Sequence, residues 1–444
     1  MAADASAAAS AVDLRDRLAS GALRAEELVE TCIARIEARE PEIGAWAWFD
    51  ADHARDQARR LDEHRRGGRP IGSLHGLPVG LKDIVDTTRI PTENGCALDA
   101  GRMPQRDAFV VDRLKAAGAL ILGKTVTAEL AYLRPGQTRN PRNPAHTPGG
   151  SSSGSAAAVA DGMAPLAVGT QTGGSVVRPA AYCGVVGFKP TFGAIPRSGI
   201  LRQSQTLDTV GVFAIDPEGV ALIADALFGH DAGDKATAPA PAPQLLSAAR
   251  SEPPLAPVLA LVHPPGWNDA DEELKAAFGE LQEALGEQVF EVELPKIFSE
   301  AESQRRIINF AEMAKNYYRY WRDGADQLGE ETREAIEKGN AVAARDYVAA
   351  LDWPDLLNAA LEEIFERCDA IVCPSALGAA PEGLDSTGSL IFNGLWTLCG
   401  TPAINLPLLT SSKGLPMGVQ LVGPRHGDGR LFRTARWLFE RMGG

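Results

Sequence analysis

Two short glycine-rich motifs in this chain match patterns that serve defined chemistry. The first, GALILGKT at 118–125, fits the P-loop pattern GxxxxGK[ST], in which a loop of backbone N–H groups surrounds phosphates. Its middle residues are apolar, however, which is typical of a buried strand, and the residues before Gly118 predict a helix where a P-loop requires a strand. We therefore interpret 118–125 as part of the core and expect no phosphate site there.

The second motif, GSSSG at 150–154, fits the GxSxG elbow that exposes a nucleophilic serine, here Ser152, at the end of a strand. Three prolines lie shortly before it, at positions 141, 144 and 148, and a central strand does not accommodate them. An apolar stretch follows the motif directly, which argues against a flexible linker. An esterase of α/β-hydrolase type, using Ser152 and a late histidine such as His426, stays open as an alternative.

A longer run at 147–191, TPGGSSSGSAAAVADGMAPLAVGTQTGGSVVRPAAYCGVVGFKPT, resembles the signature of the amidase signature family. The resemblance includes GLPVGLKDIVDT upstream and GLPMGVQL from Gly414, and it extends more thinly over nearly the whole chain. It implies the amidase signature fold, a single large α/β domain with a mixed central β-sheet covered by helices. It also implies an amidohydrolase that acts on linear C–N amide bonds without a cofactor or metal.

Mapped onto this chain, the family pattern implies three catalytic residues. Ser175 becomes the nucleophile, Ser151 the bridging serine with a cis peptide bond before it, and Lys82 the base. The separation of the two serines along the chain agrees with the family spacing. The resemblance makes the P-loop and elbow matches coincidental.

These residue types can carry out acyl transfer without a histidine. A serine hydroxyl is a weak nucleophile at neutral pH and needs a base to take its proton. Lysine serves only when neutral, so the pKa of Lys82 must fall from about 10.4 toward 7, as burial away from carboxylates can bring about. Lys82 follows an apolar strand, so we expect it to be buried, with Asp83 pointing away or screened. Protons would pass from Ser175 through Ser151 to Lys82 and return to the leaving amine.

The turn before the implied nucleophile would form the oxyanion hole. Backbone N–H groups of Thr172, Gly173 and Gly174, with Ser175 as a further candidate, are expected to face the developing negative charge. Glycines allow the backbone to come close to the substrate. By itself, Gly173-Gly174 would predict only a tight turn between a strand and a helix.

Substrate choice depends on the residues after the nucleophile. Most members of the family carry an arginine two residues after it, whereas this chain has Val177 there and Arg178 one position later. This order resembles malonamidase, in which that arginine, helped by a threonine that corresponds to Thr387, holds a substrate carboxylate. A planar guanidinium suits such a ligand. The alternative is a buried arginine paired with a protein carboxylate. Three later residues either line the pocket or pack in the core: Asn393, Trp396 and Cys399.

Helices and strands must bring these side chains together, and the hydrophobic pattern predicts where they lie. We expect an amphipathic helix over Asp13–Glu40, interrupted near Gly21, and a short strand within Leu74–Val85 that carries Lys82 into a polar loop. Alternating strands and helices predict an α/β sheet covered by helices. Further helices are expected at 112–117, 156–160, 272–285 and 301–322, and strands at 119–122, 166–168, around 372 and at 404–408.

We expect one domain over residues 1–444, with an insertion-like, mainly helical segment at about 230–365. Within it, residues 230–257 include APAPAP at 238–243. This proline- and alanine-rich stretch predicts an exposed linker or surface excursion.

Composition favours small-molecule chemistry in a cytoplasmic protein. The chain has 444 residues, 45% of them hydrophobic, which is enough for a large core. A formal net charge of −14 disfavours nucleic acid as a partner. The six cysteines show no CxxC spacing, and the histidines show no metal-binding pattern. We find neither the features of a signal peptide nor an apolar run long enough for a membrane helix, and expect no membrane partner.

Two aspects of assembly follow from the resemblance. The resemblance to malonamidase suggests a homodimer, and the expected partner is a small-molecule amide substrate. The same scaffold also occurs in a component of tRNA-dependent amidotransferases, which liberates ammonia from glutamine for a partner. The acidic chain and the position of Arg178 argue against that alternative.

Overall fold

The computed structural model describes residues 9–443, which form one α/β domain around a mixed sheet of 11 strands. The order across the sheet is β1-β3-β2-β4-β6-β5-β10-β11-β9-β7-β8. The strands are β1 (Trp46–Phe49), β2 (Pro78–Lys82), β3 (Leu120–Thr125), β4 (Leu166–Gln171), β5 (Val186–Lys189), β6 (Thr209–Ala214), β7 (Leu259–Val262), β8 (Val289–Val292), β9 (Ala370–Pro374), β10 (Ala403–Thr410) and β11 (Pro416–Val422).

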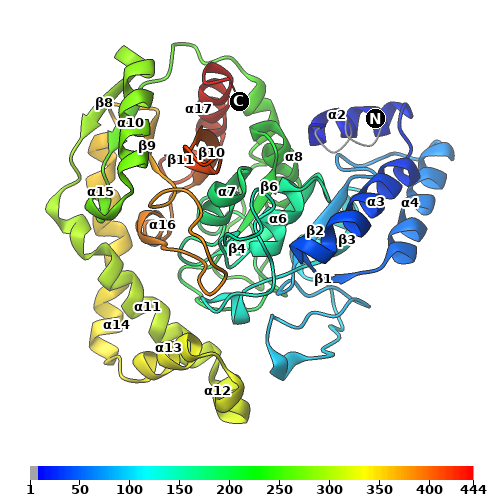
Figure 1. The fold of residues 1–444 in the computed structure, drawn as a ribbon, viewed down its shortest axis with the longest axis horizontal. Coiled ribbons are helices and arrows are strands. Elements are labelled where there is room, and N and C mark those ends of the chain that lie inside the picture. The colour runs from blue at the N-terminus through cyan, green and yellow to red at the C-terminus, as the bar shows by residue number, and fades with distance from the viewer. Residues whose placement is uncertain (1–8, 444) are drawn as a thin grey trace.

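Helices cover the sheet, and α11 to α15 gather along one flank of the molecule, opposite α3 and α4 (Figure 1). The α-helices are α2 (Ala11–Ser20), α3 (Ala25–Ile43), α4 (Ala51–Arg66), α5 (Phe109–Ala116), α6 (Ser153–Ala160), α7 (Val177–Cys183), α8 (Pro217–Leu227), α9 (Leu245–Arg250), α10 (Glu272–Leu285), α11 (Ala301–Asn316), α12 (Tyr318–Gly324), α13 (Glu330–Asn340), α14 (Ala344–Ala350), α15 (Trp353–Phe365), α16 (Ile391–Leu398) and α17 (Asp428–Arg441). No helix in the described range is long and apolar enough to cross a membrane.

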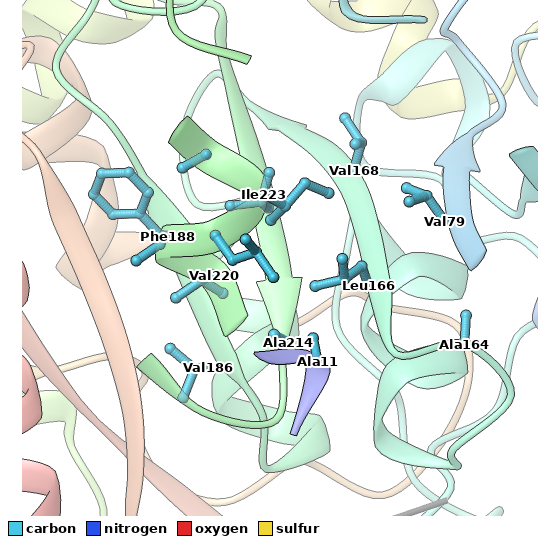
Figure 2. Packing of buried hydrophobic residues seen from close by; sticks show 14 of the residues in the cluster. Ala11, Val79, Ala164, Leu166, Val168, Val186, Phe188, Ala214, Val220 and Ile223 are labelled. Atoms are coloured by element: carbon cyan, nitrogen blue, oxygen red, sulfur yellow. The ribbon is translucent and has the colours of Figure 1, made fainter. Parts of the chain in front are cut away.

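Successive side chains of β4 point to opposite faces of the sheet, which explains why helices cover both faces. Leu166 and Val168 belong to the main core cluster together with Val220 and Ile223 of α8, and Figure 2 shows these side chains gathered around the strands. Ala167 points the other way, into a second cluster with residues of α6 and α7. Successive side chains of a strand face opposite sides, so an apolar strand buried on both faces requires a helix layer on each.

The parallel pairing of β2 with β3 and β4 places the residues expected to do chemistry at one edge of the sheet. Adjacent parallel strands end at the same edge of a sheet. The C-terminal end of β2, with Lys82, therefore lies beside the end of β4, where the TGGS turn begins. On the other side, β4 pairs with β6 in antiparallel fashion, so the sheet is mixed.

The predicted fold class and the main elements are confirmed, with a difference at one helix. The interruption expected near Gly21 within Asp13–Glu40 is confirmed, because Gly21 adopts a left-handed φ of 80° and ends α2 with its N–H bonded to the Leu18 carbonyl, and α3 follows. The helix expected at 301–322 is divided at Tyr317 into α11 and α12. Within residues 118–125, Leu120–Thr125 form β3, and the chain is buried from Ala119 to Thr125, as expected for a core strand.

The segment at 230–365 contains helices α9 to α15 together with β7 and β8, which extend the sheet at one end. Its APAPAP stretch is largely exposed, and α9, just after it, begins with Leu245 and Leu246 bonded to the Asp225 carboxylate. That the whole segment is an insertion stays a prediction. All six cysteines are free and buried.

Candidate active site

Lys82 is fully buried at the last position of β2. Its Nζ lies 2.7 Å from the Ser151 hydroxyl and 3.0 Å from the Oγ1 of Thr170, which is next to last in β4. The parallel pairing of β2 and β4 accounts for this contact, because it places both strand ends side by side. An amine with two hydroxyl neighbours and, among the residues that the structure describes, no direct carboxylate contact is suited to act as a base.

Burial lowers the pKa of Lys82 to about 7, and the negative charge of Asp208 opposes part of this effect. The neighbouring carboxylate does not reach the amine, since Asp83 accepts hydrogen bonds from the Glu93 N–H and lies 3.9 Å from the Nζ of Lys124. Lys124 itself donates to the Val85 carbonyl and to Thr92. The expectations for Lys82 and Asp83 thus match the geometry.

The loop that carries Ser151 approaches α7 closely. The peptide bond between Gly150 and Ser151 is cis, and Gly149 before it has a positive φ of 79°. A Cβ on Gly149 would lie 2.8 Å from the Cα of Pro179, so only glycine fits here. The Ser151 carbonyl accepts a hydrogen bond from the Ala128 N–H, which ties the loop to the segment after β3.

Ser175 lies in the turn between β4 and α7 and is 8% exposed. The Gln171 side chain holds the far end of this turn by accepting the N–H groups of Val176 and Val177 at 2.9 and 3.0 Å. Within residues 9–443, the Ser175 hydroxyl has no hydrogen-bond partner. The structure therefore contains the Lys82–Ser151 contact of the expected relay, and the second contact would have to form with substrate bound, as is common in apo sites.

The expected oxyanion hole is tightly enclosed. No hydrogen bond inside the described range uses the N–H groups of Gly173 or Gly174, so both remain available to a ligand. A Cβ on Gly174 would lie 2.5 Å from the Oδ1 of Asn393, and the Gly173 carbonyl accepts the Thr397 hydroxyl at 2.7 Å. Helix α16 thus backs the turn.

Arg178 connects the two serine loops. Its Nη2 donates to the Gly150 carbonyl at 2.7 Å and to the Thr387 hydroxyl at 3.0 Å, while its backbone N–H donates to the Gly174 carbonyl. The side chain is buried, with Nε and Nη1 unpartnered among the described residues. Burial lowers its pKa to about 10, and the ionisable groups that influence it are Tyr182 and Arg305, neither of them a carboxylate. The predicted alternative of a protein carboxylate as partner is wrong.

The rival serine and the later pocket candidates are accounted for differently. Ser152 is buried, and its hydroxyl exchanges hydrogen bonds with the backbone of Thr170 and with no basic side chain among residues 9–443. His426 lies at another place, with its N–H bonded to the Thr191 hydroxyl. Of the three candidates on α16 and after it, Asn393 lies against Gly174, while Trp396 and Cys399 pack in a hydrophobic cluster.

Two neighbours of the expected catalytic residues were missed from the sequence, Thr170 and Asp208. Thr170 could have been suspected, because it sits at the end of a predicted strand just before the turn. Asp208 gave no such signal. It is the last residue of a separate loop and directly precedes β6. The pairing of β6 with β4 brings it to the site, and the local pattern does not predict that pairing.

Comparisons with known proteins relate this chain to amidases. The family model "Amidase" matches residues 27–432. A glutamyl-tRNA(Gln) amidotransferase subunit from Symbiobacterium thermophilum is 34% identical over 478 aligned residues, which cover 98% of this chain and 96% of the relative. The peptide amidase from Stenotrophomonas maltophilia superposes with a TM-score of 0.83 at 29% identity, covering 98% of this chain and 97% of that one. For a 6-aminohexanoate cyclic dimer hydrolase, the TM-score is 0.88 at 27% identity, with coverage of 98% and 97%.

Proposed function

This chain belongs to the amidase family, whose members act on C–N amide bonds, and we propose that it hydrolyses a small, carboxylate-bearing amide through an acyl-enzyme on Ser175. The products are the acid and ammonia or an amine. Lys82 acts as the base and Ser151 passes the proton. The buried contact between Lys82 and Ser151, with a lysine pKa of about 7, supports this assignment.

In the first half of the proposed reaction, the Ser175 oxygen attacks the amide carbon. Its proton moves to Ser151 as Ser151 gives its own to the neutral amine of Lys82. The carbonyl electron pair moves onto oxygen, and the N–H groups of Gly173 and Gly174 stabilise the resulting oxyanion. The intermediate collapses with cleavage of the C–N bond, and the relay returns a proton to the departing nitrogen.

In the second half, water attacks the ester carbon of the acyl-enzyme. Lys82 and Ser151 take a proton from the water, and the Ser175 oxygen leaves with a proton returned by the same relay. The acid is released and the three residues regain their starting states. One base thus serves both directions of proton transfer.

The single observation that carries the substrate class is the unpaired guanidinium of Arg178. A fully buried cation with two N–H-bearing nitrogens that have no partner among residues 9–443 is costly unless an anion joins it, because burial penalises an uncompensated charge. Its other nitrogen is bonded to Gly150 and Thr387, close to both serine loops. A carboxylate bound there would be a short distance from the scissile bond, as in the malonamidase-like arrangement that we propose for this site.

The test compares matched pairs of amides in the purified enzyme. Malonamic acid is paired with propionamide and succinamic acid with butyramide, so that only the carboxylate differs. We expect the wild type to prefer the acidic member of each pair, and Arg178→Gln to lose about 10- to 100-fold of that preference, as loss of a charge-assisted hydrogen bond implies. Ser175→Ala should lower kcat by roughly five orders of magnitude on every substrate.

The serine control is Ser152→Ala, which removes the elbow-like serine and should retain turnover. Activity that survives in Ser175→Ala would overturn the nucleophile assignment. A preference for the neutral amides in the wild type, or an unchanged preference in Arg178→Gln, would overturn the substrate class while leaving the nucleophile intact.

A second function is favoured by the curated relatives, which include glutamyl-tRNA(Gln) amidotransferase subunits at 32–34% identity over 94–98% of this chain. In that case the chain would release ammonia from glutamine for a partner protein. Copurification from the native cell, followed by a glutaminase assay with and without any bound partner, separates the two functions. A stable partner that stimulates glutamine hydrolysis would establish the second, whereas activity of the isolated chain on carboxylate-bearing amides favours the first.

A further inference from the structure

Asp208 is a buried carboxylate that holds the oxyanion turn. Its Oδ1 accepts the Thr172 hydroxyl at 2.6 Å, and its Oδ2 accepts the N–H groups of Gln203 and Ser204, both at 2.9 Å. The donors to this carboxylate are two backbone N–H groups and one hydroxyl on a short side chain, so their positions are fixed. The group connects the turn before Ser175 to the loop at 203–208.

Helix α11 fixes the same loop from its other side. The buried Glu312 carboxylate accepts the Ser204 hydroxyl, the Thr206 N–H and hydroxyl, and the Tyr347 hydroxyl. Asn309 adds a hydrogen bond from the Gln203 side chain at 3.1 Å. Loop 203–208 is therefore held between α11 and the oxyanion turn, with Asp208 at the inner end.

A small enclosed cavity links Asp208 to the surroundings of the proposed base. It measures about 10 Å³, which is roughly the space that one water molecule needs, and its lining includes Thr170, Thr172 and Asp208. Thr170 is the residue whose hydroxyl contacts the Lys82 amine. The carboxylate therefore lies near the lysine in an enclosed region, where charges interact more strongly than in water.

We infer that Asp208 is a positioning residue for the reaction, which holds Thr172 in the oxyanion turn and places a negative charge near Lys82. The inference rests on the proposed function, in which Lys82 is the base. It assigns loop 203–208 and α11 a role in catalysis, since they hold this carboxylate in place.

The sign of the electrostatic effect follows from the charges around the two groups. A negative carboxylate favours the protonated amine, so Asp208 raises the pKa of Lys82 against the opposing effect of burial. Other ionisable groups near the pair are Arg197, which bonds the Asp208 carbonyl and pairs with Asp234, and Tyr317. Lys124 and Asp83 face each other and Val85 on the far side of β2. Of the ionisable groups in residues 9–443, Asp208 is the one whose charge acts on Lys82.

The experiment measures kcat/KM against pH for the full-length enzyme and for Asp208→Asn. The wild type should lose activity on the acid side as Lys82 becomes protonated. In Asp208→Asn, this acid limb should move to lower pH by roughly half a unit or more, because the carboxylate no longer favours the protonated amine. At the pH optimum, kcat should fall about tenfold or more, with little change in KM, as the oxyanion turn loses its anchor.

Asp428→Asn is the matched control. Asp428 is also a buried aspartate that accepts a threonine N–H and hydroxyl, from Thr191, but it lies beside Lys189 and not beside Lys82. Its loss imposes a comparable structural cost, so we expect a lower thermal stability and an unchanged acid limb.

Thr172 provides a second route if Asp208→Asn does not fold. Thr172→Val removes the hydrogen bond that favours the ionised carboxylate, so the acid limb should again move to lower pH, and Thr172→Ser should restore the wild-type profile. If the acid limb of both Asp208→Asn and Thr172→Val stays at the wild-type pH, this inference is overturned and the proposed function is not. A wild type with no acid limb between pH 6 and 8 would overturn Lys82 as the base and the proposed mechanism with it.

Discussion

Burial changes what an ordinary side chain can do, and Lys82 is the residue where this matters most. An exposed lysine is a cation at neutral pH, whereas here the surroundings favour the neutral amine and leave Asp208 as the opposing influence. Two other lysines, Lys124 and Lys189, are equally buried, with pKa values near 8 and 7. What distinguishes Lys82 is its contact with a serine hydroxyl, not its pKa.

This argument predicts the pH dependence of the reaction. A base must be deprotonated to act, so kcat/KM should rise with pH through a midpoint near 7 and level off above it. Steady-state assays from pH 5.5 to 9 give this midpoint. Lys189→Met, which removes another buried lysine of similar pKa away from Ser151, should leave the midpoint unchanged. A midpoint that moves with Lys189 would contradict the assignment of Lys82.

At the scale of elements, the site depends on close backbone contacts between loops and helices. Helix α6 starts just after Ser151 and lies against β2, β3 and β4. At Gly154 the contact is with backbone, since a Cβ there would lie 2.2 Å from the Ala45 carbonyl oxygen and 2.4 Å from the Val126 nitrogen. Backbone atoms cannot rotate away as a side chain can, so only glycine permits this packing.

Gly154→Ala should therefore lower the free energy of unfolding by about 1–3 kcal/mol, as overpacking does in a dense core. The matched control is Gly279→Ala in α10, an exposed helical position where nothing lies within 4 Å of the added methyl. It should raise the free energy of unfolding by about 0.5–1 kcal/mol, because alanine loses less backbone entropy. Urea unfolding followed by circular dichroism measures both, and equal effects of the two substitutions would contradict the packing argument.

At the scale of the whole molecule, buried lysines link stability to pH. Lys189 ends β5 and donates to the carbonyls of Pro190 and Thr401, which joins β5 to the segment before β10. Its pKa is about 7 in the folded protein and about 10.5 when unfolded. Between these values the unfolded chain binds a proton that the folded protein does not, so stability rises with pH and is lost as pH falls through this range toward 7.

Lys189→Met removes the proton that Lys189 binds in the unfolded chain but not in the folded protein. Between pH 7.5 and 9.5, the slope of the unfolding free energy against pH should decrease by about 1.4 kcal/mol per pH unit relative to the wild type. Urea titrations at three pH values give the slope. The exposed Lys413→Met serves as the control and should leave it unchanged. An unchanged slope in Lys189→Met would mean that this lysine is protonated in the folded protein.

The local sequence pattern predicts the core elements well where one segment suffices. Leu120 to Leu122 and Leu166 to Val168 are apolar runs that can only be buried, and Glu272–Leu285 has a clear helical period. It predicts the break near Gly21, but it fails at Tyr317, where the division of a continuous helical pattern depends on packing. The short strands β1, β5 and β8 likewise give weak local signals, because each is stabilised mainly by its neighbour in the sheet.

The sequence by itself determined the family, the fold class and the expected identities of Ser175, Ser151 and Lys82, because these lie in one long motif with fixed residue types and spacing. Only the tertiary structure decided what surrounds them. Two facts depend on segments far apart along the chain: Arg178 has no carboxylate partner in the described part of the chain, and Asp208 shares a cavity with the neighbours of Lys82. Charge and burial act through space, so the electrostatics of a site follow from the folded arrangement and not from local spacing.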